Sequence, residues 1–363
     1  MAFSASTFHH NDNFDFLHAV EKYTVESIPD LNIGTVNGIR ISEANFTQLL
    51  EYGTRSKLGV GRYTVYDESL RSSTEITNID VSPDFMQAIQ PVVERMARDL
   101  NHPTKITITP YKLILYKTDD FFTRHIDNVH KPNMIMTLVV DLPTVLEGGT
   151  LVINDSYIPH ATTQPNLILF YNDVKHEVMT VESGVKMSVI FDVCQTAELI
   201  PEVIDKYAPN VRTGVRQLQR KAIAFVANHV YFDDFILKGV DRIAYELFKR
   251  EGNVTVNKVI VKNNRVFLPE IMPILELGGL KTLFTKVDTV DTEELGLDNS
   301  VNYDDDIDSI DIPIQDECRL GDVYFLRSNA SGKLLYDAMD EIYLGNEGFY
   351  DKIYESVAII LKR

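Results

Sequence analysis

Apolar residues in the middle of the chain fall into short runs separated by polar, turn-forming segments. Alternation with a period of two is typical of a half-buried strand, and a short continuous apolar run is typical of a strand buried on both faces. No helical pattern separates these runs, which favours an antiparallel sandwich or barrel over a parallel α/β sheet. The predicted strands are KITITPYKLILY (105–116), MIMTLVVDL (134–142), GTLVIN (149–154), NLILFY (166–171) and KMSVIFDV (186–193).

Helical periodicity occurs on both sides of this β-rich segment. Residues 83–101 place apolar side chains from Phe85 to Leu100 on one face, which predicts a helix that braces a sheet. Further along, the pattern predicts helices at 213–230 and 231–250 and strands at 254–262, 322–326 and 356–361.

These patterns predict a mainly β protein with flanking helices, organised in three regions. Residues 1–104 form an α/β region that braces the core, 105–195 form the β-rich core, and 196–363 form an accessory α+β region. With 363 residues, 44% of them hydrophobic, the chain can bury a sizeable core and form two domains or one elaborated domain.

Charge and composition narrow the class of protein. The formal net charge is −18, so the overall field repels nucleic acid. Residues 288–317 contain 12 acidic residues and no Lys or Arg, which predicts a solvated loop. The chain lacks a leader pattern and a run long enough to span a bilayer, so we expect no membrane association and a cytoplasmic or nuclear location. Two cysteines fit a reducing compartment.

Three residues have the chemistry of a metal site. His125 opens the sequence His125-Ile126-Asp127 at the end of a predicted strand. Residues two apart in a strand point to the same side, so the imidazole and the carboxylate can bind one ion together. His176 follows about fifty residues later, just after NLILFY. Two histidines and one carboxylate form the facial triad of non-haem iron(II) oxygenases. The alternative is a structural His–Asp pair and an unrelated core histidine.

A cation and a hydroxyl follow this triad on the last predicted strand of the core. Lys186 comes ten residues after His176, and Ser188 shares its side of the strand. A cation and a hydroxyl on one face suit the distal carboxylate of 2-oxoglutarate. Lysine supplies a point charge where arginine would offer a bidentate fork, so the carboxylate is held with less orientation.

The segment from about Tyr111 to Val193 resembles the catalytic domain of the prolyl 4-hydroxylase-like 2-oxoglutarate dioxygenases. The resemblance implies a double-stranded β-helix, or jelly roll, with iron(II) as the metal and 2-oxoglutarate and O2 as cosubstrates. Ascorbate is an additional candidate cofactor. In this family the tyrosine before the metal ligands hydrogen-bonds the cosubstrate, which assigns that role to Tyr116. The matching residues are Tyr116, His125 and Asp127, Leu146-Glu147-Gly148-Gly149-Thr150-Leu151, His176-Glu177-Val178 and Gly184-Val185-Lys186.

Three departures from the family pattern accompany the resemblance. Tyr116 is followed by Lys117 and not by the usual glycine, and lysine stands at position 186 where arginine is common. Asp141 occupies the position where related enzymes often have a tyrosine. An extra carboxylate near the cosubstrate is unfavourable unless it faces elsewhere or pairs with a base.

The resemblance favours hydroxylation of a peptidyl residue, proline first, with release of succinate and CO2. A small-molecule hydroxylase, a catalytically inactive jelly-roll binding module and a zinc hydrolase using the same three ligands remain open, as does the oligomeric state. Residues 343–348 with the final SVAIILKR resemble the C-terminal segment of some multidomain relatives. The remaining histidines of the second half and the loops, among them His130, His160 and His229, lack comparable partners and are expected at the surface or in loops.

Overall fold

The computed structural model describes residues 8–9, 11–18, 21–60, 63–220, 222–229, 231, 236–262, 265–267, 323–326 and 353–362. The chain divides into two compact units. The first comprises Val20–Ile204 and Lys238–Val240, and the second comprises Met1–Ala19, Asp205–Leu237 and Asp241–Arg363. The predicted acidic loop 288–317 and residues 343–348 lie outside the described residues.

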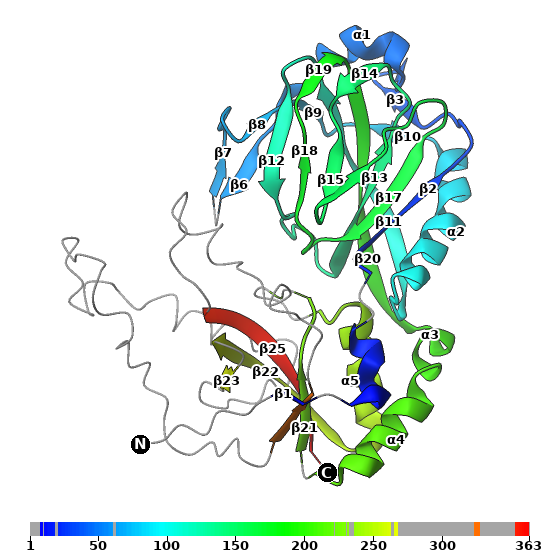
Figure 1. The fold of residues 1–363 in the computed structure, drawn as a ribbon. Coiled ribbons are helices and arrows are strands. Elements are labelled where there is room, and N and C mark those ends of the chain that lie inside the picture. The colour runs from blue at the N-terminus through cyan, green and yellow to red at the C-terminus, as the bar shows by residue number, and fades with distance from the viewer. Residues whose placement is uncertain are drawn as a thin grey trace, which may run out of the picture. The chain divides into compact units, whose positions relative to one another are not determined.

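Two antiparallel sheets form the body of the first unit (Figure 1). The strands of the larger sheet are β2 (Tyr23–Ser27), β5 (Thr54–Arg55), β9 (Thr74–Ile76), β11 (Thr104–Tyr116), β13 (Met134–Asp141), β17 (Asn166–Tyr171) and β20 (Lys186–Leu199). The strands of the smaller sheet are β8 (Arg71–Ser72), β12 (Phe121–His125), β15 (Leu151–Ile153), β16 (Ser156–Ile158) and β18 (His176–Val178). The strand orders are β2-β17-β13-β20-β11-β9-β5 and β16-β15-β18-β12-β8. The two facing sheets confirm the predicted jelly roll.

Short elements surround these sheets. They are the strands β3 (Gly34–Val36), β4 (Ile39–Arg40), β6 (Leu58–Val60), β7 (Tyr63–Val65), β10 (Asp80–Val81), β14 (Leu146–Gly148) and β19 (Val181–Gly184), and the helices η2 (Glu43–Asn45), α1 (Phe46–Leu50) and α3 (Pro201–Asp205). β3, β4 and β10 form one small sheet, and β14 pairs with β19 as β6 pairs with β7.

The larger sheet is buried on both faces, which explains the continuous apolar runs of its central strands. Every residue of β13 and of β17 is buried. Helix α2 (Pro83–Asp99) covers the outer face, where Phe85 lies against Phe191 with ring centroids 6.3 Å apart. Each large apolar side chain buried in this way contributes about 1.5–3 kcal/mol. Thr137 and Asp141, two polar residues of β13, lie on the face opposite this helix, between the two sheets.

A glycine sets the turn that leads into β20. Gly184 has φ +80°, and a Cβ at this position would lie 2.0 Å from the Val145 carbonyl oxygen. Gly38 has the same φ of +80°, but nothing lies within 4 Å of the position of its Cβ. An alanine at either position would therefore strain the backbone to the same degree. Only at position 184 would its Cβ also clash with a neighbouring atom.

We expect Gly184→Ala to lower the free energy of unfolding by about 3 kcal/mol or more, because strain and clash add. Gly38→Ala, the matched control, should cost only about 1–2 kcal/mol, since it introduces the strain alone. Urea unfolding of both variants measures the difference. Equal losses would contradict the close contact between the β19–β20 turn and Val145.

The second unit is a six-stranded sheet flanked by helices. Its strands are β1 (Phe8–His9), β21 (Ala222–Val226), β22 (Asn253–Lys262), β23 (Arg265–Phe267), β24 (Val323–Leu326) and β25 (Ile353–Lys362), in the order β1-β24-β21-β25-β22-β23. Its helices are η1 (Asp12–His18), α4 (Ala208–Leu218) and α5 (Gly239–Glu251). The predicted strands at 254–262, 322–326 and 356–361 are confirmed as β22, β24 and β25.

The prediction of one helix over 213–230 was wrong in its second half. The helix ends at Leu218, and Ala222–Val226 forms β21, a strand with every residue buried. A run of five apolar residues has no period that separates a buried strand from a buried helix. Pairing with β24 and β25 decides the outcome, and this pairing is long-range. The predicted helix over 231–250 begins only at Gly239.

The first residues of the chain belong to the second unit, whereas the sequence analysis grouped them with the region that braces the core. Phe16 stacks on Tyr207 with ring centroids 4.6 Å apart, and Phe14 meets the edge of Phe248 at 6.2 Å. These contacts join residues about 190 to 230 positions apart, which local periodicity cannot reveal.

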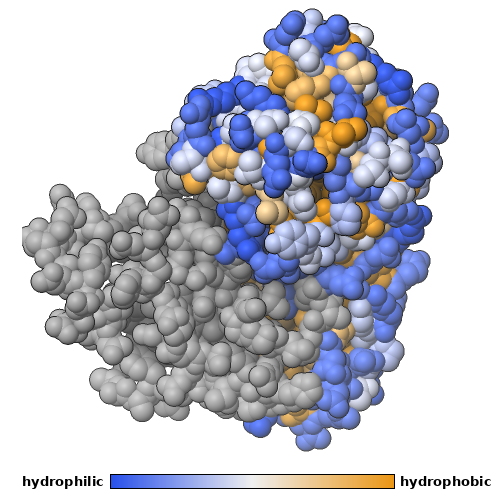
Figure 2. All heavy atoms as spheres, turned by 45° about the horizontal axis from the view of Figure 1, so that its top comes forward, coloured by the Kyte–Doolittle hydropathy of each residue, from blue (hydrophilic) through white to orange (hydrophobic). Residues whose placement is uncertain are grey.

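On the face shown in Figure 2, hydrophobic residues of the described chain lie in small groups among hydrophilic ones. Single exposed apolar side chains, such as Val145 and Tyr157, are normal for a folded protein. Within the described residues, no helix has the length and apolar character that crossing a bilayer requires.

Candidate metal and cosubstrate site

The three predicted metal-binding residues come together between the two sheets. His125 ends β12 and His176 begins β18, and their Cα atoms are register partners across the smaller sheet. Asp127 lies two residues beyond the end of β12, in a loop and not in the strand that the sequence analysis assumed. One potential ligand atom from each residue lies within 4.8 Å of the others. The Asp127 Oδ1 atom is 4.0 Å from His125 Nε2 and 3.7 Å from His176 Nε2.

Hydrogen bonds orient all three side chains toward a common point. His125 Nδ1 lies 2.8 Å from the Thr123 carbonyl oxygen, and His176 Nδ1 lies 3.0 Å from that of Val174. A carbonyl oxygen only accepts, so each Nδ1 carries the proton and each Nε2 keeps its lone pair for a metal. Thr137 Oγ1 donates to Asp127 Oδ2 over 2.5 Å, which leaves Oδ1 facing the histidines.

The electrostatics also suit a metal. Burial, followed by the neighbouring His176, lowers the pKa of His125 well below its usual range, so this imidazole is neutral at neutral pH. Phe122 stacks on the His125 ring at 3.5 Å, and Phe170 lies 4.7 Å from the His176 ring. Two imidazoles and one carboxylate fit iron(II) in a facial triad, an arrangement with three positions open for cosubstrate and oxygen.

Thr137 was not identified from the sequence, because it lies ten residues after Asp127 within an apolar run of the opposite sheet. We expect Thr137→Val, a substitution of nearly equal volume, to lower iron(II) affinity by about 10–100-fold, since hydrogen bonds to metal ligands tune binding on this scale. Anaerobic metal titration measures the effect. Thr123→Val is the matched control, because the Thr123 hydroxyl donates to the Leu70 carbonyl oxygen and makes no contact with the carboxylate. Unchanged affinity in Thr137→Val would contradict the role of this hydrogen bond.

The three residues predicted to bind the cosubstrate lie together on the inner face of the larger sheet. Lys186 and Ser188 share one side of β20, and the Cα atom of Tyr116 on β11 is the register partner of Lys186. Burial raises the pKa of Tyr116 to about 12, so the phenol remains a hydrogen-bond donor. Lys186 is only 2% exposed. The structure thus places a buried ammonium and two hydroxyl-bearing residues in adjoining strands.

Asp141 faces this group and pairs with it. Its Oδ1 atom lies 2.6 Å from Lys186 Nζ and 3.4 Å from Ser188 Oγ, and its Oδ2 atom lies 2.8 Å from His160 Nδ1. We expected this carboxylate either to face elsewhere or to pair with a base. It pairs with two basic side chains, Lys186 and His160. His160 does lie in a loop, between β16 and β17, but its side chain is 14% exposed and has a partner, which corrects the expectation for this residue.

Arg71, at the start of β8, is a second buried residue that the sequence analysis did not identify. Its guanidinium lies over the Phe122 ring at 4.2 Å, beside the metal-facing histidine, and donates to Ser73 Oγ and to the Lys57 carbonyl oxygen. The other two histidines lie in loops, as expected, and His130 is also exposed. His130 pairs with the buried Asp192 at 3.1 Å, and His229 is buried with only 3% exposed.

Comparisons with known proteins give one family match and several similar solved structures. Residues 111–191 match the family model described as the 2OG-Fe(II) oxygenase superfamily. No curated protein matches the chain. Among solved structures, a Pseudomonas putida prolyl-4-hydroxylase is similar at 14% identity over 51% of this chain and 97% of that one, with a TM-score of 0.32. A viral collagen prolyl hydroxylase from Paramecium Bursaria Chlorella virus-1 is similar at 16% identity over 48% and 97%, also with a TM-score of 0.32.

A third similar structure is a Trichoplax adhaerens prolyl hydroxylase in complex with a peptide fragment of the hypoxia inducible factor oxygen degradation domain. It shares 13% identity over 53% of this chain and 88% of that one, with a TM-score of 0.32. The family match covers the strands that carry the metal-facing and cosubstrate-facing side chains. Residues 111–191 therefore resemble the 2OG-Fe(II) oxygenase superfamily, a match that implies iron(II), 2-oxoglutarate and O2 as the cofactor and cosubstrates.

Proposed function

We propose that this protein is an iron(II)- and 2-oxoglutarate-dependent dioxygenase that hydroxylates a peptidyl residue, with proline as the first candidate. His125, Asp127 and His176 would hold the iron. Lys186, with Ser188 and Tyr116, would hold the distal carboxylate of 2-oxoglutarate. The proposal rests on three donor atoms that lie close together and are free to bind a metal: Nε2 of each histidine and Oδ1 of the aspartate. The other ring nitrogen of each histidine and the other carboxylate oxygen already form hydrogen bonds within the protein.

The protein contributes orientation and a protected site. When bound, iron, 2-oxoglutarate and O2 supply the oxidative decarboxylation to succinate and CO2 that is coupled to hydroxylation. The Phe122 and Phe170 rings pack on the two histidines and shield them from water. Thr137 fixes the carboxylate of Asp127, so the ligand set is arranged before the metal arrives.

The first test uses the visible absorption of anaerobic protein with iron(II), before and after addition of 2-oxoglutarate. A charge-transfer band that appears with the cosubstrate supports bidentate chelation by 2-oxoglutarate. Bound iron without such a band would contradict the proposal and favour the inactive binding module. Metal analysis after anaerobic purification distinguishes the dioxygenase from a zinc hydrolase that uses the same three ligands. A zinc hydrolase would retain zinc, and Lys186 would have no role in it.

The substrate class rests on the sequence resemblance to prolyl 4-hydroxylase-like enzymes. Succinate release should rise when a peptide substrate is added, with ascorbate present to maintain activity. Proline-containing peptides should gain one oxygen atom by mass spectrometry, and the matching peptides with alanine for proline should not. Stimulation by small molecules alone would replace the peptidyl substrate with the small-molecule alternative and leave the dioxygenase assignment intact.

A further inference from the structure

The cation proposed for the cosubstrate is already paired with a carboxylate of the protein. Asp141 Oδ1 lies 2.6 Å from Lys186 Nζ, and both side chains are buried. The charges of Lys186 and Asp141 cancel, so the ion pair as a whole does not attract the distal carboxylate of 2-oxoglutarate. Asp141 by itself would repel that carboxylate. A second positive charge beside Asp141 would restore the attraction for the distal carboxylate.

We propose that His160 is a further residue of the cosubstrate site, whose proton restores the positive charge that Asp141 cancels, so that 2-oxoglutarate binds when His160 is protonated. This inference rests on the proposed function. It concerns the regulation and strength of cosubstrate binding, to which neither the facial triad nor the family match assigns this histidine.

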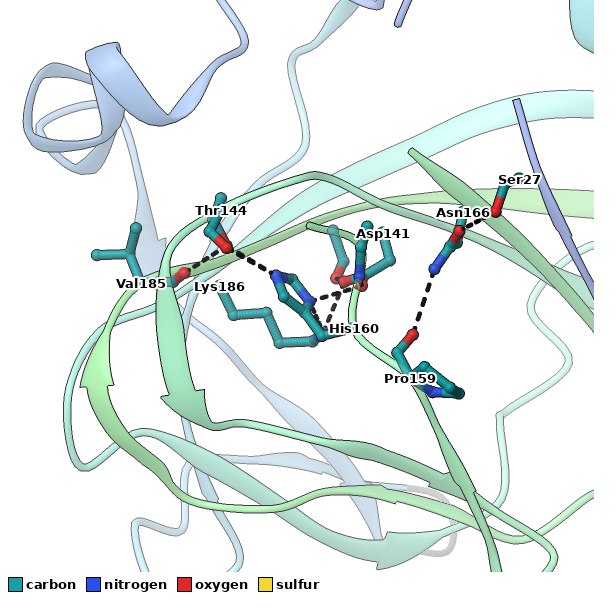
Figure 3. A network of polar contacts seen from close by, with 10 residues as sticks. Ser27, Asp141, Thr144, Pro159, His160, Asn166, Val185 and Lys186 are labelled. Atoms are coloured by element: carbon teal, nitrogen blue, oxygen red, sulfur yellow. Dashed lines mark hydrogen bonds and ion pairs between the residues drawn. The ribbon is translucent and has the colours of Figure 1, made fainter. Parts of the chain in front are cut away.

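The hydrogen-bond geometry of His160 fits an imidazolium (Figure 3). Its Nδ1 atom lies 2.8 Å from Asp141 Oδ2, and its Nε2 atom lies 3.1 Å from the Thr144 carbonyl oxygen. Both partners accept only. The Thr144 hydroxyl, 3.2 Å from Nε2, donates to the Val185 carbonyl oxygen over 2.6 Å and so faces the ring as an acceptor as well. A ring with acceptors at both nitrogens carries two protons.

Asp141 is held as an anion throughout the relevant pH range. Its burial would raise the pKa, but Lys186 and His160 outweigh that effect and hold the pKa of Asp141 at about 2. The Ala161 backbone N–H also donates to Oδ2, over 3.1 Å. Lys186, Asp141 and protonated His160 together carry a net charge of +1, which matches one carboxylate. With neutral His160 the net charge of the cluster is zero.

The groups around His160 come from the strands β13, β17 and β20 and from the loop that follows β13. Asp141 on β13 favours the proton, whereas Lys186 on β20, whose Nζ is 3.4 Å from Nδ1, opposes it. Thr144 contributes neutral acceptors from the turn that follows β13. Asn166 on β17 lies nearby in Figure 3 and is neutral, with hydrogen bonds to Ser27 and to the Pro159 carbonyl oxygen. Within the described residues, Asp141 is the acidic group in contact with this imidazole.

The test measures the dissociation constant of 2-oxoglutarate from the anaerobic iron(II) protein, by the charge-transfer band, between about pH 6 and about pH 9. The wild-type constant should rise by about tenfold or more as His160 loses its proton. His160→Gln should bind as weakly at the low pH as at the high pH. Asp141→Asn should bind tightly at both, because Lys186 alone then supplies the charge.

A double variant shows whether 2-oxoglutarate binding depends on the positive charge of His160 or on the imidazole ring itself. Asp141→Asn with His160→Gln should regain the tight, pH-independent binding of Asp141→Asn, although it lacks the imidazole. Asp155→Asn is the matched control, since it removes one carboxylate in an exposed turn, paired with Arg124, and Asn tolerates its φ of +66°. It should titrate as the wild type does. The iron ligands are the same in every variant. Any effect of their protonation on the dissociation constant of 2-oxoglutarate is therefore also the same, and differences between variants come from the substituted residues.

The outcomes separate the two proposals. A wild-type protein that holds iron but shows no band with 2-oxoglutarate at any pH contradicts the proposed dioxygenase function. A band whose affinity changes equally with pH in wild type, His160→Gln and Asp141→Asn overturns the role of His160 and leaves the dioxygenase proposal in place. A double variant that binds as weakly as His160→Gln overturns the charge argument as well.

Discussion

Replacement of Asp127 with alanine should abolish iron binding and turnover while leaving the fold intact. Asp127 supplies the single carboxylate of the triad, and its Oδ1 atom faces both histidines. Loss of a direct ligand should cost more than the about 10–100-fold that is typical for a hydrogen bond to a ligand. The side chain is 25% exposed and lies in a loop, so its removal leaves no core cavity. Anaerobic iron titration and thermal unfolding together measure the two expectations.

Glu177→Ala provides the matched control. Glu177 follows His176 directly in β18, and successive residues of a strand point to opposite faces. The control removes one carboxylate beside the site without removing a ligand, so iron affinity should remain at the wild-type value. Iron binding by Asp127→Ala at the strength of the control would show that Asp127 is not a ligand, and would support the structural His–Asp pair.

Features that depend on local order were predictable from the sequence. The strands of the jelly roll are apolar runs of ordinary strand length, and the helix over 83–101 has a clear 3.6-residue period. His125, Asp127 and His176 could be proposed because each lies at a strand end or just beyond it, where the resemblance gives a known spacing. The roles of these residues stay a proposal until the metal is measured.

Features that depend on pairing between distant strands were not predictable. Asp141 meets Ser188 through the register of β13 and β20, and His160 reaches Asp141 from a loop nineteen residues along the chain. No spacing rule relates these positions. The buried run Ala222–Val226 is likewise ambiguous until its neighbours β24 and β25 are known. Asp141 is recognisable from the sequence as a departure from the family pattern, but its partners follow only from the strand register.

The Lys186–Asp141 pair links stability to binding. A buried ion pair often contributes little net stability, yet removal of one partner is costly because the other charge is left buried. Asp141 is 1% exposed and therefore cannot recover its solvation when Lys186 is removed. Any substitution of Lys186 thus changes two properties at once, and only a second substitution can separate them.

Lys186→Ala should spare the metal and raise the 2-oxoglutarate requirement by about 100-fold or more, since truncating a buried charge partner costs about 2–5 kcal/mol of binding free energy. Lys186 is not among the three residues whose donor atoms converge, so iron affinity should be unchanged. The free energy of unfolding should also fall, by about 3–5 kcal/mol, because Asp141 is left with His160 as its remaining charged partner.

The variant Lys186→Ala with Asp141→Asn resolves these two effects. It removes both charges, so the free energy of unfolding should recover much of the loss. Its 2-oxoglutarate affinity at about pH 9, where His160 is neutral, should stay low, because no positive charge remains to hold the distal carboxylate. Urea unfolding and the charge-transfer titration measure the two quantities on the same protein. If the double variant regained wild-type 2-oxoglutarate affinity, Lys186 would be a structural partner of Asp141 and the cosubstrate would be anchored elsewhere, whereas stable protein that holds iron but binds 2-oxoglutarate weakly would place the anchor at Lys186.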